Sequence, residues 1–289
     1  VASIPVFLSG FVEDLNRKVK PFYRLIFAFV SAALGIYLVG ALLTRVDIIY
    51  IDKFLTIKAI AILVTLIAVG GVTNAFNIID GFNGLVSVVS MFIFLGLGFV
   101  SFKVGDMFLV YICFTMIFAI SGFFILNYPY GKIFLGDGGA YFVGFIVATV
   151  SILLVERHRQ VSAFFPLLLC IYPIFETIFS MYRRKIIRRG KATKADGLHL
   201  HTLIYKRVTN YIFGPIIQGN RIYRNSLTSL FLWFLCVFSL MPAILFWNNK
   251  LMLAVFTVVF ILVYLGLYKS IINFKVGKYL KLEKIKKIK

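Results

Sequence analysis

Three stretches of this 289-residue chain combine carboxylates, amides and glycines in a way that suits binding of a phosphate or a cation. The first is 73–85, TNAFNIIDGFNGL, where Asp80 lies among three asparagines and two glycines. The others are 127–139, NYPYGKIFLGDGG, and 196–201, DGLHLH. Beside lipid such polar groups are costly unless water, a cation or a polar ligand satisfies them. Glycines also let backbone N–H groups approach a phosphate closely.

Three carboxylates stand at the ends of different apolar runs. They are Asp14, Asp80 and Asp137, and the ends of packed helices can bring them together. Converging carboxylates suit Mg²⁺, which usually keeps several waters and bridges to substrate phosphates. The basic residues of 183–194, Arg188 among them, suit a diphosphate.

The two histidines of the third stretch are two residues apart. His199 and His201 would share a face of a strand but lie far apart around a helix. They act on one ligand only if they stand in an extended or irregular loop, where they could chelate a cation, contact a phosphate or orient a substrate.

Each group also has a plain structural explanation. Asp14 could belong to an ordinary solvated helix end, and Asp80 and Asp137 could cap the helices that follow them. His199 and His201 in a basic loop could be surface residues. Together, however, the groups predict a phosphoryl or phosphosugar transfer onto a lipid at a membrane surface.

The composition predicts an integral membrane protein. Hydrophobic residues make up 61% of the chain and the mean hydropathy is +0.96, well above the range of soluble domains. The net charge of +20 is explained by basic cytoplasmic loops and anionic lipid headgroups or phosphates, so no nucleic acid partner is expected.

The apolar runs predict an all-α, polytopic fold in a single domain, 1–289. Each membrane span needs about 20 apolar residues, and 1–12 is a partial helix at the start of the chain. A basic tail, 269–289, follows the last span. The eight full spans are expected at 22–43, 54–73, 85–102, 107–126, 139–155, 161–182, 226–247 and 251–268.

The charged loops predict the orientation. The loop 183–224 carries eleven Lys and Arg and one acidic residue, and the tail 269–289 carries eight Lys. Alternating spans put both on one side, which the positive-inside rule makes cytoplasmic. The same alternation puts all three polar stretches on that side, whereas transporters usually place polar residues near the bilayer midplane.

In this order, NAFNIIDGFNGL, NYPYGKIFLGDGGAYFVG and DGLHLH resemble the polyprenyl-phosphate N-acetylhexosamine-1-phosphate transferase superfamily, glycosyltransferase family 4. The spacing of the histidines is closest to the WecA-like branch, which starts O-antigen and related cell-envelope glycans. The resemblance implies that undecaprenyl phosphate attacks the β-phosphate of a UDP-amino sugar, releasing UMP, with Mg²⁺ as cofactor. It also implies the bacterial inner membrane as location, and a homodimer is left open.

The resemblance assigns roles to single residues. Asp137 and Asp14 would bind the metal, and Asp14 would also align or deprotonate the lipid phosphate. Asp80, His199 and His201 would be catalytic. The side chains expected to hold the nucleotide sugar are Asn77, Asn83, Asn127, Phe134 and Arg188.

Four positions depart from the family pattern. Glu13 and Glu176 stand where aspartate is expected, Asn83 stands where many bacterial members have aspartate, and Thr202 replaces a third histidine. The family also has a further helix and a loop before residue 1, so the amino terminus is expected to be missing.

Two other functions follow from these departures and from the acidic residues. One is a non-enzymatic lipid-glycan transporter or an inactive truncated scaffold. The other is a CDP-alcohol phosphotransferase, but its signature needs an Arg and two more Asp soon after an Asp-Gly pair. No Arg or Asp follows Asp80-Gly81 for more than twenty residues, which argues against that class.

Overall fold

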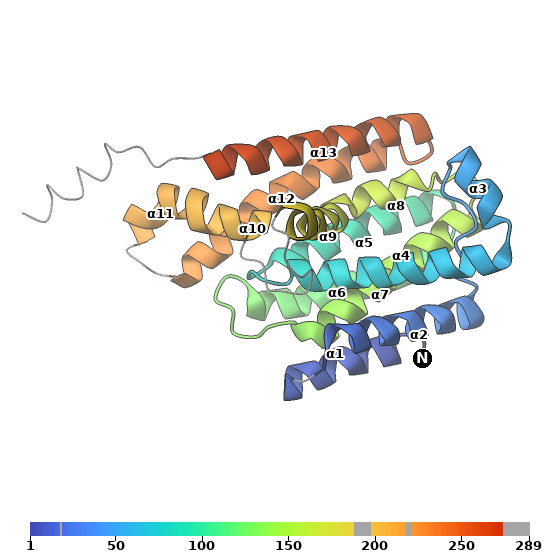
Figure 1. Cartoon of the computed structure of the whole chain (residues 1–289), viewed down its shortest axis with the longest axis horizontal. Helices are drawn as coiled ribbons and strands as arrows, with labels where there is room; N and C mark the ends of the chain where they lie inside the picture. Colours follow the sequence, from blue (N-terminus) through green and yellow to red (C-terminus); the bar gives the residue numbers. More distant parts are fainter. Residues whose placement is uncertain (18, 188–197, 218–220, 274–289) are drawn as a thin grey trace, which may run out of the picture.

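The computed structural model describes residues 1–17, 19–187, 198–217 and 221–273. Over these residues the chain forms helices and connecting loops without any β-strand (Figure 1), which confirms the all-α prediction. The helices run roughly alongside one another in an elongated bundle.

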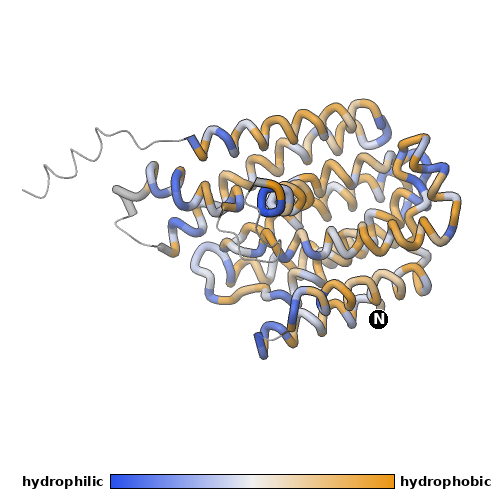
Figure 2. The backbone as a smooth tube through the Cα atoms, viewed as in Figure 1, coloured by the Kyte–Doolittle hydropathy of each residue, from blue (hydrophilic) through white to orange (hydrophobic). Residues whose placement is uncertain are grey.

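Seven helices in the described part of the chain are long and apolar enough to cross a membrane. Figure 2 shows that hydrophobic residues fill these helices, whereas hydrophilic residues gather at the two ends of the bundle. This pattern confirms a multi-pass helical membrane protein. The seven are α2 (Pro21–Val39), α4 (Lys58–Ile79), α5 (Leu85–Lys103), α6 (Met107–Asn127), α7 (Gly136–Arg157), α12 (Arg221–Leu245) and α13 (Lys250–Asn273).

Shorter elements connect or flank these helices. Figure 1 shows α10 and α11 at the same end of the bundle as the loop that precedes α7, and α3 at the opposite end. We call the end with α10 and α11 the site end and the end with α3 the far end. The shorter elements are α1 (Ile4–Asn16), α3 (Ile49–Leu55), α8 (Phe164–Leu169), α9 (Ile171–Tyr182), α10 (Leu200–Leu203), α11 (Asn210–Ile217) and the π-helical turns η1 (Arg183–Ile187) and η2 (Ile204–Thr209).

The prediction of one continuous span over 161–182 is wrong. The segment divides at Cys170 into α8 and α9, neither of which is long enough to span a membrane. Pro166 and Pro173 each lie in the first turn of one of these helices. Proline is tolerated in a first turn, where its missing N–H has no partner to lose. In a helix interior it removes a hydrogen bond and clashes with the preceding turn, so one helix does not run through both prolines.

Several predicted element ends are also wrong by a few residues, and three of these errors concern site residues. Helix α4 continues to Ile79 rather than ending at residue 73, so Asn77 is helical. Helix α7 begins at Gly136, which puts Asp137 in its first turn. Helix α1 continues to Asn16, so Asp14 lies in its last turn. These three polar residues, which seemed to mark loops, are therefore held on helices.

Glycines bring two helices close to α7. A Cβ on Gly10 of α1 would lie 2.5 Å from the backbone nitrogen of Gly138, and a Cβ on Gly144 would lie 2.8 Å from Cα of Thr73 on α4. Small residues are the usual means of close helix packing in membranes. The three helices that carry Asp14, Asn77 and Asp137 are therefore in direct backbone contact.

The far end of the bundle is closed by polar contacts between loops. Asp47 Oδ2 accepts a hydrogen bond from Ser162 Oγ at 2.7 Å. The Arg45 guanidinium donates to the carbonyls of Val155 at 3.0 Å and Val161 at 2.8 Å. These contacts tie the loop before α3 to the end of α7 and the start of α8, so this end is a fixed scaffold.

We predict that Gly10→Ala destabilises the protein by about 2 kcal/mol, because the added methyl meets backbone atoms of α7 that cannot turn away. The measurement is thermal unfolding of the purified protein in detergent. The control is Gly122→Ala on α6, where a Cβ meets nothing within 4 Å, so no loss is expected. Equal unfolding temperatures for the two variants would contradict the close approach of α1 and α7.

Candidate active site

Asp14 caps the first turn of α7. Its Oδ1 accepts the backbone N–H of Asp137 at 2.8 Å and its Oδ2 accepts that of Gly138 at 3.0 Å. The residue before them, Gly136, has a φ of +72°, and a Cβ there would lie 2.6 Å from Asp14 Oδ2. Only glycine suits that conformation and that space. A carboxylate is also favoured electrostatically at a helix amino terminus.

Asp137 accepts two further side-chain donors. Asn77 Nδ2 donates to Asp137 Oδ1 at 2.7 Å, and Arg24 of α2 forms an ion pair with Asp137 Oδ2. The structure thus brings the predicted residues Asp14, Asn77 and Asp137 together. Arg24 is a site residue that the sequence analysis misses. A single cation in the first turn of an apolar helix is equally well explained by the positive-inside rule.

Asp80 follows directly on α4 and faces the same cluster. Burial, followed by repulsion from the nearby carboxylates of Asp137 and Asp14, raises its pKa from 3.8 to about 7. This repulsion is what a bound cation would relieve. Among the described residues, no group of three or more His, Cys, Asp or Glu is arranged to hold a metal by itself. Substrate oxygens would have to complete the shell, as is usual for Mg²⁺.

Two of the asparagines that were predicted to bind the nucleotide sugar hold loops in place. Asn127 Oδ1 accepts the Gly84 N–H at 2.6 Å, and its Nδ2 donates to the Ile133 carbonyl at 2.8 Å. Asn83 Nδ2 donates to the Pro129 carbonyl at 3.0 Å. Both asparagines are only 5% exposed. Their amide groups therefore join the turn after α4 to the loop before α7.

The other predicted residues differ in accessibility. Phe134, on the loop before α7, is 77% exposed, so its ring is open to a ligand. Glu13 Oε2 accepts the Val19 N–H at 2.7 Å and stabilises the connection between α1 and α2. Arg188 lies outside the described residues.

The two histidines meet the turn after α4. Their rings stack with centroids 5.1 Å apart, and the His201 ring lies 5.4 Å from that of Phe82. A Cβ on Gly81 would lie 3.8 Å from His201 Nε2. His201 therefore lies against the residue that follows Asp80 in the sequence. Burial lowers the pKa of His201 to about 4, so this ring is neutral at pH 7. His199 Nδ1 lies 2.9 Å from Glu176 Oε1 on α9.

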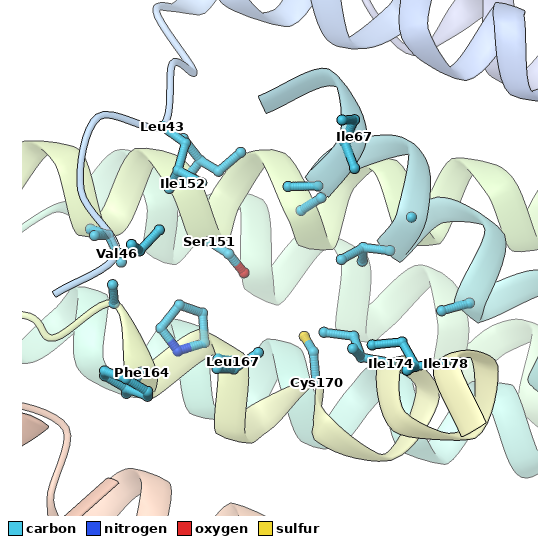
Figure 3. A pocket seen from close by; sticks show the side chains of 18 of the residues that line it. Leu43, Val46, Ile67, Ser151, Ile152, Phe164, Leu167, Cys170, Ile174 and Ile178 are labelled. Carbon is cyan, nitrogen blue, oxygen red and sulfur yellow. The ribbon is translucent and has the colours of Figure 1, made fainter. Parts of the chain in front are cut away.

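An apolar groove of about 500 Å³ lies between α4, α7, α8 and α9. Figure 3 shows Ile67 of α4 and Ile152 of α7 on one side of it, and Phe164 and Ile178 on the other. At the site end the groove reaches Ala75 on α4, about 8 Å along the helix axis from Asp80. Its lining suits a hydrocarbon chain with a polar group at the site.

The arrangement as a whole suits chemistry on a phosphate. Carboxylates, an amide, a guanidinium and two imidazoles gather at one end of the bundle. Such a set can bind a phosphate together with a divalent cation and can exchange a proton near neutral pH.

The family profile described as glycosyl transferase family 4 matches residues 1–155. A probable undecaprenyl-phosphate N-acetylglucosaminyl 1-phosphate transferase of Bacillus subtilis is 26% identical over 205 residues, which cover 70% of this chain and 56% of that protein. The undecaprenyl-phosphate alpha-N-acetylglucosaminyl 1-phosphate transferase of Escherichia coli K12 is 29% identical over 214 residues, or 71% of this chain and 56% of that protein.

Another relative has a different name, a phospho-N-acetylmuramoyl-pentapeptide-transferase of Streptococcus thermophilus. It is 31% identical over 156 residues, which cover 51% of this chain and 45% of that protein. The chain thus spans little more than half the length of the curated relatives it matches.

We predict that Asp80→Asn stabilises the protein more at pH 8 than at pH 5 when no divalent cation is present. The pKa of Asp80 is about 7 in the folded state and near 3.8 when unfolded. Ionisation therefore favours the unfolded state increasingly as the pH rises from about 4 to 7, and asparagine abolishes this effect.

The measurement is the unfolding temperature in detergent with a chelator at both pH values. Asp52→Asn, in the far-end helix α3, controls for the loss of a carboxylate elsewhere. A gain that is the same at pH 5 and pH 8 would show that Asp80 does not titrate in this range.

Proposed function

Because the chain belongs to glycosyl transferase family 4, we propose that it transfers an N-acetylhexosamine 1-phosphate from a UDP-sugar to undecaprenyl phosphate. An oxygen of the acceptor phosphate attacks the sugar-bearing phosphorus of the donor. The bond from that phosphorus to the bridging oxygen breaks, UMP leaves, and a polyprenyl-diphosphate sugar forms. The names of the relatives from Bacillus subtilis and Escherichia coli support this acceptor and this kind of group.

The observation that carries the proposal is the acidic cluster at the site end, together with an apolar groove that runs along α4 as far as Ala75. Asp14 is bonded to the first turn of α7, which carries Asp137, and Asp80 at the end of α4 is near enough to both carboxylates for them to raise its pKa in addition to burial. The groove extends along α4 toward the same end, as far as Ala75. A lipid phosphate needs both surfaces, because its chain is apolar and its headgroup carries charge. The proposal therefore seats part of the polyprenyl chain in the groove.

Asp80 is the carboxylate we propose for proton exchange with the acceptor phosphate. A phosphate monoester loses its second proton with a pKa of about 6, and the pKa of Asp80 is about 7. Groups with similar pKa values near the working pH exchange a proton most effectively. His201, neutral at pH 7, lies beside the same turn and is proposed to orient the phosphate.

Asp137 is the carboxylate we propose to hold a Mg²⁺ ion. The ion would neutralise charge on the diphosphate of the donor. Asp14, the second expected ligand, has both oxygens bonded to the first turn of α7. We therefore propose that Asp14 contributes by holding Asp137 in place. Arg24, which is paired with Asp137, is a second cation available to a phosphate.

The donor nucleotide is proposed to bind over the loop before α7. Exposed Phe134 offers a ring for the uracil to stack on, and Asn77 faces the cluster. Asn83 and Asn127 would support this surface by fixing its loops. Arg188, in the basic segment after η1, is proposed to bind the diphosphate.

The site end is proposed to face the cytoplasm of a bacterial inner membrane. The basic segment 183–224 follows α9, and the Lys-rich tail 269–289 begins in the last turns of α13. The positive-inside rule puts such segments in the cytoplasm. A nucleotide sugar is available on that side. The product would start a cell-envelope glycan, and the WecA-like spacing of the histidines supports O-antigen or a related polymer.

We predict that Asp137→Asn lowers the rate of UMP release by a factor of about 100 or more, as loss of a charge-stabilising group does. The assay uses the full chain in detergent with undecaprenyl phosphate, Mg²⁺ and a panel of UDP-amino sugars. Asp52→Asn is the control. An unchanged rate for Asp137→Asn, or no UMP from the wild type with any donor, would contradict the proposed function.

We predict that Gly71→Leu raises the KM for undecaprenyl phosphate several-fold. Gly71 lines the groove, and a Cβ there meets nothing within 4 Å, so the larger side chain narrows the groove without forcing helices apart. The KM for the UDP-sugar should not change, nor should turnover of a short-chain polyprenyl phosphate. Gly122→Leu on α6 is the control. Equal effects on long and short acceptors would place the lipid chain elsewhere.

A further inference from the structure

Glu176 is a carboxylate that the proposed chemistry does not use, and it is completely buried. It lies on α9 with an exposed fraction of 0%. Burying an ionised carboxylate costs several kcal/mol unless hydrogen bonds and charges compensate it. A residue with this cost needs partners that satisfy both of its oxygens.

Three donors from two other segments satisfy Glu176. Its Oε1 lies 2.9 Å from His199 Nδ1 and accepts the Leu200 N–H at 3.2 Å. Its Oε2 accepts the hydroxyl of Tyr264, on α13, at 2.7 Å. One side chain thus connects α9, the start of α10 and α13.

The set of partners decides which nitrogen of His199 carries a proton. An ionised carboxylate only accepts hydrogen bonds, so Nδ1 of His199 must be the donor. Nε2 is then the nitrogen that Glu176 does not hold. A carboxylate that fixes the tautomer and the orientation of an imidazole in this way is a recurrent arrangement around reacting groups.

His199 is connected to the turn that begins with Asp80 through the ring of His201. Its ring stacks on that of His201 with an interplanar angle of 7°. His201 in turn lies against Phe82 and next to Gly81, in the turn that begins with Asp80. A carboxylate on α9 thus contacts one imidazole, and that imidazole stacks on the one beside this turn.

We propose that Glu176 is a positioning residue, which holds His199 through Nδ1–H and leaves Nε2 available for a phosphate of the donor or acceptor. This inference rests on the proposed function for its kinetic consequence, although the tautomer of His199 can be measured without any activity. It gives the glutamate a role at a position where the family pattern leads us to expect aspartate.

The kinetic test compares Glu176→Gln with Tyr264→Phe. Glu176→Gln keeps the shape but loses the charge, and we expect kcat to fall by about tenfold or more, as for other residues that orient a functional imidazole. The KM for the UDP-sugar should change less than kcat. Glu176→Asp, which keeps the charge, should restore part of the rate.

Tyr264→Phe is the matched control, because it removes one hydrogen bond from the same buried carboxylate but leaves the histidine contact intact. It should lower the unfolding temperature and leave kcat nearly unchanged. If Tyr264→Phe and Glu176→Gln lower kcat equally, Glu176 has only a structural role and the inference is overturned.

The second test is spectroscopic and does not depend on turnover. The chain has three histidines, so selective ¹⁵N-histidine labelling gives a simple spectrum, which His199→Asn assigns. We expect Nδ1 of His199 to be protonated in the wild type and the Nδ1–H form to lose its dominance in Glu176→Gln. A His199 protonated at Nε2 alone would overturn the inference even in an active enzyme. If the spectrum is as expected but the protein releases no UMP, the inference about Glu176 is retained and the proposed function is rejected.

Discussion

The contact on which the rest of the site depends is the one between Asp14 and the first turn of α7. A helix that starts at the edge of a membrane has unpaired backbone N–H groups, which are costly where water is scarce. Asp14 satisfies two of them from another helix, and glycines on both helices let the backbones approach. Asp137 is thereby held where Asn77 and Arg24 reach it.

Polar residues at the site end divide into those that hold the structure and those that remain available. Asn83 and Asn127 are buried, and their amide groups are bonded to backbone atoms of neighbouring loops. Phe134 on the adjacent loop is exposed. This division has a physical cause, since a loop beside the membrane must satisfy its own backbone before it can present side chains to a ligand.

The two ends of the bundle differ in whether their charged side chains are paired with neighbouring groups. At the far end, Arg45 and Asp47 bond to backbone and hydroxyl groups of the neighbouring loop and close it. At the site end, burial of Asp80 and repulsion from the carboxylates of Asp137 and Asp14 raise the pKa of Asp80. Functional sites commonly carry such unfavourable charge.

The sequence alone determined the class of fold and most of the residues that gather at the site end. Apolar run length depends on local composition, and the motifs carry the family resemblance in their order along the chain, so Asp14, Asn77, Asp80, Asp137 and the histidines could be named in advance. Only the tertiary structure decided the break at Cys170, the pairing of Arg24 with Asp137, and the role of Glu176 as the partner of His199. These features depend on which helices pack together, because a buried charge is defined by partners that are distant in the sequence.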